Sequence, residues 1–164
     1  MTRIAVHGAG GRMGCSVVAF LAAEPGAELV GAIERAGHPA LGKDAGLVAG
    51  RGEPLGVLVG PDFAPALERA EVVIDFSAPV AIPGLLGACA QRKLGVVVGT
   101  TGLDAEAGAA IEKLAEVAPV VCAPNFSVGV NVLWALSEWA VQLLGPEFDI
   151  DGICDGERAW IGGV

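Results

Sequence analysis

The sequence predicts an α/β protein built on a doubly wound parallel sheet, and three observations support this fold class. Short apolar runs rich in Val and Ile recur along the chain, which is typical of buried parallel strands. Segments with helical character lie between them, as the crossovers of a parallel sheet require. A glycine-rich turn joins the first apolar run to the first helical segment.

The expected strands are the short apolar runs 4–6, 29–33, 57–59, 72–76, 96–98 and 120–122. The expected helices lie between or after these strands, at 13–23, 64–70, 80–92, 104–115 and 130–144. The glycine- and proline-rich stretch 35–54 interrupts the alternation, because both residue types favour turns. It is predicted to be a long surface loop with room for one helical turn.

The turn from Gly8 to Gly14 reads Gly-Ala-Gly-Gly-Arg-Met-Gly and predicts dinucleotide binding. Glycine lets the backbone approach a pyrophosphate closely, and the helix that follows directs unpaired N–H groups at phosphates. Glu34 comes 20 residues after Gly14, where an acidic side chain accepts hydrogen bonds from a ribose hydroxyl. A tight glycine turn that binds no ligand is the alternative.

Three further turns with polar groups follow later strands, at 75–77, 99–102 and 123–127. Ligands bind at this edge of open α/β sheets. The amides, hydroxyls and carboxamide of these turns can orient a nicotinamide and its ribose. For each turn alone, a helix cap is the stronger interpretation, since Ser, Thr and Asn are good N-caps. Their occurrence on one edge with the glycine turn favours a cofactor cleft.

The composition argues against nucleic-acid and metal partners and indicates a reducing compartment. The net charge of −9 and isoelectric point of about 4.6 argue against nucleic-acid binding by a basic surface, although Arg12 and Arg35 can serve one small anion. The sequence has no C-x-x-C pair and two histidines, so we expect no metal site. The cysteines fit small core residues of a reduced compartment: Cys15, Cys89, Cys122 and Cys154.

Two segments bear on localisation. A strand is expected almost at the N-terminus, so we expect no signal peptide and a cytoplasmic protein. The stretch 117–137 carries no charge over 21 residues, which is transmembrane length. Its prolines and asparagines favour a buried strand, a polar loop and the start of a helix over a membrane span.

The motifs at 8–14, 34–35, 75–77, 99–102 and 125–131 together resemble one family. It is the 4-hydroxy-tetrahydrodipicolinate reductases, also called dihydrodipicolinate reductases, of bacterial lysine and diaminopimelate biosynthesis. The resemblance covers about residues 1–150. It implies a Rossmann-like dinucleotide-binding domain over 1–125. In 126–164 it implies a linker helix and a remnant of an α+β substrate and oligomerisation domain, most of which is either deleted or part of a longer polypeptide that this sequence does not represent.

The resemblance also implies an activity, which is NADH- or NADPH-dependent reduction of 4-hydroxy-tetrahydrodipicolinate to tetrahydrodipicolinate. It implies a cytoplasmic homotetramer that acts on a small dicarboxylate, with no nucleic-acid or membrane partner. Glu34 suits a free ribose hydroxyl and Arg35 suits a 2′-phosphate, so the pair fits both cofactors.

The resemblance assigns the cofactor contacts residue by residue. The pyrophosphate is wrapped by Gly8, Ala9, Gly10, Gly11, Arg12 and Met13, and the adenosine ribose meets Glu34 and Arg35. The nicotinamide side is lined by Gly99, Thr100 and Thr101, and the nicotinamide is covered by Ala123, Pro124, Asn125 and Phe126.

The sequence departs from the family after residue 150. The family continues with a His-His-Arg-His-Lys segment and a Ser-Gly-Thr loop, which supply a proton donor and a cationic grip on the dicarboxylate. Here 151–158 reads Asp-Gly-Ile-Cys-Asp-Gly-Glu-Arg, and no His or Lys follows Lys113. A nucleotide-binding module without catalysis is therefore the alternative function. A homoserine dehydrogenase is disfavoured by the motifs at 99–102 and 125–127.

No catalytic residue is assigned. His7 precedes the glycine turn, where strand-end packing is the better interpretation, and His38 lies in the predicted loop. Arg158 is a candidate anion contact, but an exposed position in the tail is favoured. Trp134 and Trp139 on the last helix are predicted to be core or interface anchors rather than cofactor contacts.

Overall fold

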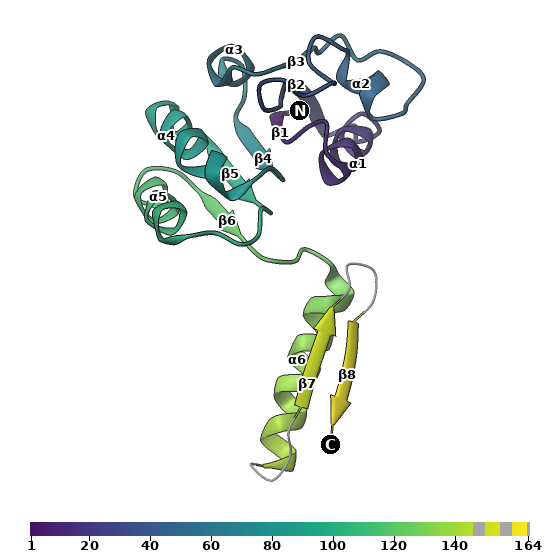
Figure 1. The fold of residues 1–164 in the computed structure, drawn as a ribbon, viewed down its shortest axis with the longest axis vertical. Helices are drawn as coiled ribbons and strands as arrows, with labels where there is room; N and C mark the ends of the chain where they lie inside the picture. The colour runs from purple at the N-terminus through teal and green to yellow at the C-terminus, as the bar shows by residue number, and fades with distance from the viewer. Residues whose placement is uncertain (146–149, 155–158, 164) are drawn as a thin grey trace. The chain divides into compact units, whose positions relative to one another are not determined.

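The computed structural model describes residues 1–145, 150–154 and 159–163. Internal contacts divide the chain into two compact units, Met1–Pro124 and Asn125–Val164. Figure 1 colours the first unit from purple to green and the second from green to yellow.

The first unit is built on a parallel sheet of six strands in the order β3-β2-β1-β4-β5-β6. The predicted doubly wound α/β sheet is therefore confirmed. The strands are β1 (Thr2–His7), β2 (Ala27–Ile33), β3 (Val59–Gly60), β4 (Val72–Asp75), β5 (Gly95–Val98) and β6 (Val120–Cys122). The strand order reverses between β1 and β4, which is where such sheets form a ligand crevice.

Helices cover both faces of this sheet, and Figure 1 shows α4 and α5 on one side and α1 on the other. The helices are α1 (Arg12–Leu21), α2 (Ala45–Val48), α3 (Phe63–Leu67), the 3₁₀ turn η1 (Pro79–Ala81), α4 (Ile82–Arg92) and α5 (Ala105–Ala115). Each face has its own apolar core. Along β1, Ala5 belongs to the core with α4 and α5, whereas Val6 belongs to the core with α1. Successive side chains of a strand point to opposite faces, so one short strand serves both cores.

The structure differs from the predicted elements in the loop 35–54 and the strand that follows it. The loop contains the single helical turn α2, and β3 is Val59–Gly60 rather than 57–59. The Asp44 carboxylate caps α2 by accepting the N–H groups of Gly46 and Leu47, and it also accepts those of Leu55 and Gly56. These hydrogen bonds, that from Leu55 foremost, lower the pKa of Asp44. One half-buried carboxylate thus organises both ends of the segment.

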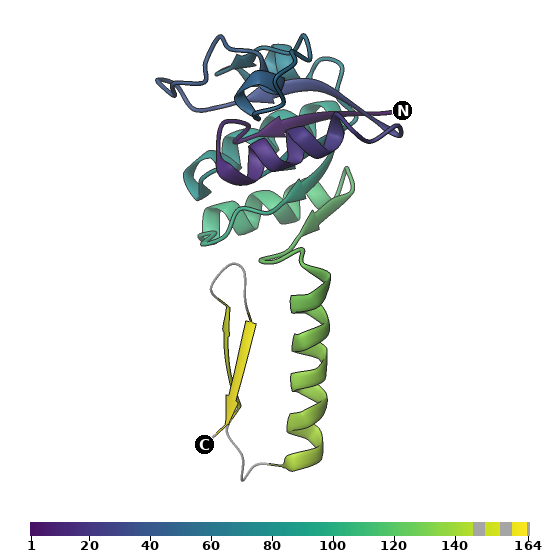
Figure 2. The ribbon, with the colours of Figure 1, turned by 90° about the vertical axis from the view of Figure 1, so that its right-hand side faces the viewer.

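The second unit consists of α6 (Val128–Leu144) and an antiparallel hairpin of β7 (Ile150–Cys154) and β8 (Ala159–Gly163). Figure 2 shows α6 as one long helix, and its residues contact β8. The helix matches the predicted 130–144 closely, with Ser127 as its N-cap, whose hydroxyl accepts the Val130 N–H at 3.4 Å. The family resemblance also implies a strand that begins near residue 150, whereas the second strand of the hairpin was not predicted.

The uncharged stretch 117–137 is divided between β6, a turn and the first part of α6. Over the described residues, no helix is both long enough and apolar enough to cross a bilayer. Trp134 and Trp139 are both exposed on α6, so neither is a core residue within the described part of the chain.

Candidate functional site

A cavity of about 330 Å³ opens at the carboxyl ends of β1, β2 and β4, where the strand order reverses. Its volume lies at the lower end of the range for ligand pockets, ~300–1,000 Å³. It is lined by His7, Gly8, Gly11, Glu34, Arg35, His38, Phe76, Ser77, Ala78, Val80 and Ala81. The cavity therefore occupies the place where dinucleotides bind in open α/β sheets.

The glycine turn between β1 and α1 is so closely packed that two positions require glycine. Gly8 has φ +78°, and a Cβ there would overlap the carbonyl oxygen of Phe76. A Cβ on Gly14 would overlap the carbonyl oxygen of Gly8. The predicted turn thus has the close backbone packing that its sequence indicated.

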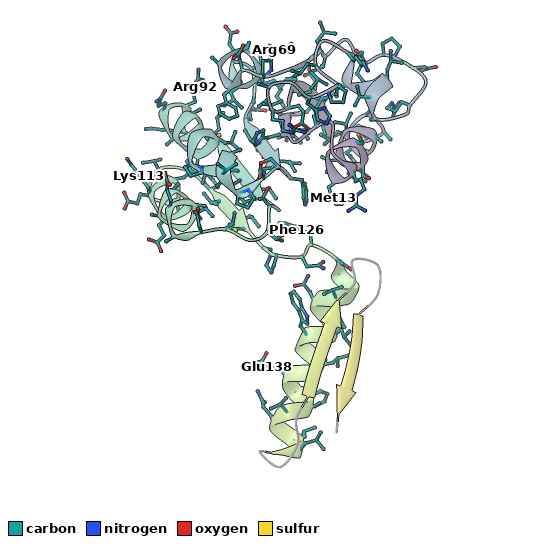
Figure 3. The ribbon with its side chains drawn as sticks, in the orientation of Figure 1. Met13, Arg69, Arg92, Lys113, Phe126 and Glu138 are labelled. Carbon is teal, nitrogen blue, oxygen red and sulfur yellow. The ribbon has the colours of Figure 1, made fainter. Side chains whose placement is uncertain are left out.

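Most amides of this turn are used internally. The N–H groups of Gly8 and Ala9 donate to the Ile33 carbonyl at 2.9 and 3.1 Å, and that of Gly11 donates to the Gly8 carbonyl at 3.0 Å. By contrast, the first-turn N–H groups of a helix have no intrahelical acceptor. At the N-terminus of α1, where Arg12 and Met13 are exposed, these groups can therefore receive an anion. Figure 3 labels Met13 at this end of α1.

Glu34 lies directly after β2 and connects that strand to the glycine turn. Its carboxylate accepts the Gly10 N–H at 3.1 Å and the Arg35 N–H at 2.9 Å, and the residue is only 9% exposed. A carboxylate offers about four acceptor positions, so both oxygens keep capacity for a ribose hydroxyl. Arg35 is exposed at the rim of the same cavity.

A second cavity of about 490 Å³ lies on the α2 side of the glycine turn, and His38 lines both cavities. The His38 ring packs on Gly10, and its Nδ1 accepts the Ala40 N–H at 3.2 Å. Cys15 lies nearby and donates to the Ala9 and Val48 carbonyls. Burial, together with the Glu34 charge, raises the pKa of Cys15, so this thiol stays protonated at neutral pH.

The turns after β4 and β5 are joined below the cavity by Asp75, which is completely buried. Its Oδ1 pairs with His7 Nδ1 and accepts the Ser77 hydroxyl, both at 2.6 Å, and its Oδ2 accepts the Thr100 hydroxyl at 2.5 Å. Thr100 is therefore buried with its side chain turned inward, whereas Thr101 is exposed. Gly99 packs against the Phe76 ring, where a Cβ would overlap it.

The remaining predicted residues are divided between the two units. Ala123 donates its N–H to the Val98 carbonyl at 3.2 Å, so it lies beside the end of β5, and Pro124 follows it. Asn125 and Phe126 belong to the second unit. There the Asn125 side chain accepts the Ser127 N–H at 2.7 Å, and the Asn131 amide donates to the Asn125 carbonyl at 3.1 Å. These contacts shape the start of α6.

The structure therefore places four of the predicted cofactor residues, Gly8, Gly11, Glu34 and Arg35, around one cavity. The sequence analysis included the turn 75–77 among the candidate cofactor turns without giving Asp75 a contact of its own, and it interpreted His7 as strand-end packing. A polar residue at the end of an apolar strand was the available signal for both. Arg158 lies outside the described residues. Within the described parts of the chain, no three His, Cys, Asp or Glu side chains form a cluster that could hold a metal ion.

Comparison with known proteins finds similarity to one family of reductases. A family model described as dihydrodipicolinate reductase, N-terminus, matches residues 2–126. The chain is 48% identical over 151 residues to a 4-hydroxy-tetrahydrodipicolinate reductase of Anaeromyxobacter dehalogenans, with 92% of the chain and 56% of the relative covered. It is 43% identical over 151 residues to that of Geobacter sulfurreducens, with the same coverage.

Among solved structures, a dipicolinate-bound dihydrodipicolinate reductase from Paenisporosarcina sp. TG-14 matches with a TM-score of 0.71 and 24% identity, over 96% of this chain and 62% of that one. This match shows a shared fold. The chain spans about half the length of the curated relatives it matches.

Proposed function

The chain belongs to the dihydrodipicolinate reductase family, and we propose that its activity is the NADH- or NADPH-dependent reduction of 4-hydroxy-tetrahydrodipicolinate to tetrahydrodipicolinate. That activity belongs to the synthesis of lysine and diaminopimelate. The observation that carries the proposal is the closely packed glycine turn held against the Glu34 carboxylate where the strand order reverses. This arrangement is a binding site for a dinucleotide rather than for the dicarboxylate itself.

The residues at the cavity fit a nicotinamide dinucleotide. The N-terminus of α1 faces the pyrophosphate with its first-turn amides, Glu34 accepts a ribose hydroxyl, and Arg35 pairs with the 2′-phosphate when NADPH is bound. The turns at 99–101 and 123–126 line the nicotinamide side in this proposal. The bound cofactor supplies the hydride, and the protein supplies orientation.

The same proposal gives each part of the chain a role. Residues 1–125 form the dinucleotide-binding domain, and 126–164 form the linker helix and part of the substrate and oligomerisation domain. The protein acts in the cytoplasm on a small dicarboxylate, as a homotetramer, with neither nucleic acid nor membrane as partner. The exposed apolar side chains of α6 suit an element that other surfaces cover.

A Glu34–Arg35 pair predicts a specific difference between the two cofactors. Arg35→Ala removes the guanidinium that meets the 2′-phosphate, so NADPH binding weakens by about 1.5–3 kcal/mol, while NADH binding stays nearly unchanged. Titration calorimetry with each cofactor measures this difference. Arg69→Ala is the matched control, because Arg69 pairs with Glu28 at 3.1 Å and does not line the cavity. Equal weakening of both cofactors by Arg35→Ala would contradict the assignment.

Nucleotide binding without turnover is the alternative, favoured by one observation: the family's His-rich segment does not occur in these 164 residues. On this alternative, the 164-residue chain binds NADPH and leaves the substrate unreduced, whereas on the proposed function it oxidises NADPH when substrate is added. General acid catalysis alone contributes ~10²–10⁴ in rate. An absorbance assay of NADPH oxidation with freshly generated substrate tests this expectation. Robust turnover would place the proton donor on this chain.

A further inference from the structure

The Asp75 carboxylate holds together the ends of three neighbouring strands. It bonds to His7 at the end of β1, to Ser77 just after β4 and to Thr100 just after β5. Thr100 also accepts the Ser77 N–H at 2.8 Å, so the turns after β4 and β5 are linked to each other directly. The four side chains thus form one connected network beside the cavity.

Such a network is costly unless every member is satisfied. A buried carboxylate must recover its lost hydration through hydrogen bonds, and His7, Ser77 and Thr100 supply them to Asp75. Among the described residues, no buried side-chain N or O atom lacks a partner. A buried polar network is nevertheless weak support for stability, because well-packed apolar side chains often serve as well. Unlike apolar packing, the hydrogen bonds of this network fix the orientation of three turns relative to one another.

The mutual orientation of these turns matters because the network connects two different parts of the candidate site. On one side, His7 and Ser77 line the cavity beside Gly8 and Gly11. On the other side, Thr100 lies within the turn after β5, next to the exposed Thr101. A dinucleotide crosses the point where the strand order reverses, so its two halves meet turns from both sides.

We infer that Asp75 is a positioning residue, which acts through Thr100 and Ser77 to align the turn after β5 with the glycine turn after β1. The inference rests on the proposed cofactor. The network keeps the binding surface for the nicotinamide half in register with the surface for the pyrophosphate half. A ligand that lacks the nicotinamide does not need the turn after β5, so its binding is independent of this alignment.

The test compares NADH with ADP-ribose, which lacks the nicotinamide, on the same chain. Thr100→Val keeps the shape of the side chain and removes both hydrogen bonds of the hydroxyl. We expect this substitution to weaken NADH binding about tenfold, which corresponds to the loss of a hydrogen bond to a charged group. ADP-ribose binding should weaken less than about twofold. Thr100→Ser keeps the hydroxyl and should restore NADH binding. Titration calorimetry gives both dissociation constants, and their ratio is the readout.

If Thr100 has a merely structural role, Thr100→Val should weaken the binding of both ligands equally or of neither. Either result would overturn the inference. If Thr100→Val does not fold, Asp75→Asn replaces it, since Asn keeps the size of the side chain and exchanges one acceptor oxygen for a donor. Failure of both variants to fold would show that the network serves stability and would also overturn the inference. If the unaltered chain binds neither ligand, the proposed function itself fails.

Discussion

The two units of this chain use apolar side chains in opposite ways. In the first unit, Leu85 of α4 and Val98 of β5 are completely buried, and two cores cover both faces of the sheet. In the second unit, no residue of α6 is buried, and Trp139 and Leu143 are 61% and 73% exposed. Yet α6 is rich in apolar residues along its whole length.

The difference shows that apolar content alone does not make a core. The six strands of the first unit provide two surfaces against which helices pack, and Figure 3 shows charged side chains such as Arg92 and Lys113 pointing outward from it. For α6, the described residues provide only a two-stranded hairpin. In the proposed function, this apolar face belongs to the linker helix that other surfaces cover.

Separating the two units should produce the largest difference in stability between them. If both fragments were equally stable, the contrast between the two units would be wrong. A fragment of residues 1–124 keeps both cores, so we expect it to melt cooperatively. A peptide of residues 125–164 should show little helix, because isolated helices of this length and lone hairpins are marginally stable in water. Circular dichroism melts of the two fragments provide the measurement. Cooperative melting of the 125–164 peptide as a monomer would contradict the expectation.

Two leucine-to-alanine substitutions, one in each unit, test the same contrast at single residues. Leu85→Ala removes a side chain from the closed core and should cost about 2–5 kcal/mol of unfolding free energy. Leu143→Ala removes an exposed side chain of the same size and should change stability by no more than about 0.5 kcal/mol. Urea unfolding of both variants measures the difference. Similar losses would show that α6 packs on a surface in solution.

A pair of glycine substitutions extends the contrast to the backbone. Gly14→Ala should cost about 3 kcal/mol, because its Cβ would meet the Gly8 carbonyl inside the closely packed turn. Gly129→Ala, in the first turn of α6, has only an ordinary contact with Ser127 Oγ at 3.8 Å. It should therefore stabilise the helix by about 0.5 kcal/mol. Thermal melts and helix content report the two effects, and a harmless Gly14→Ala would refute the close packing of the turn.

The smallest expected effect is the pH dependence of the core thiol. Burial raises the pKa of Cys89 from 9.0 to about 12. A pKa raised in the folded state means that stability is fully present below about pH 9 and is lost as the pH rises toward 12. The stability advantage of wild type over Cys89→Ala in urea should shrink across that range. An advantage independent of pH would contradict the burial of this thiol.

Local signals in the sequence predicted most of the first unit. The Val- and Ile-rich runs predicted all six strands of the sheet within a few residues of their observed bounds, and the segments between them predicted the helices that cover it. The glycine spacing predicted the turn at Gly8 and Gly14 because backbone crowding there excludes any side chain. The assignment of cofactor contacts stays a prediction.

Contacts between distant parts of the chain set features that no local pattern in the sequence shows. Asp75 bonds to His7, 68 residues away, and to Thr100, 25 residues away. No local pattern shows that Thr100 turns inward, because its direction is set by a neighbouring strand. Similarly, Asp44 organises a segment that reaches Gly56, and β3 lies where it can pair with Ala32 and Ile33. Local sequence patterns were therefore enough to predict the helices, the strands and the glycine turn. The long-range pairing of buried polar groups decided which side chains hold the turns and which remain for a ligand.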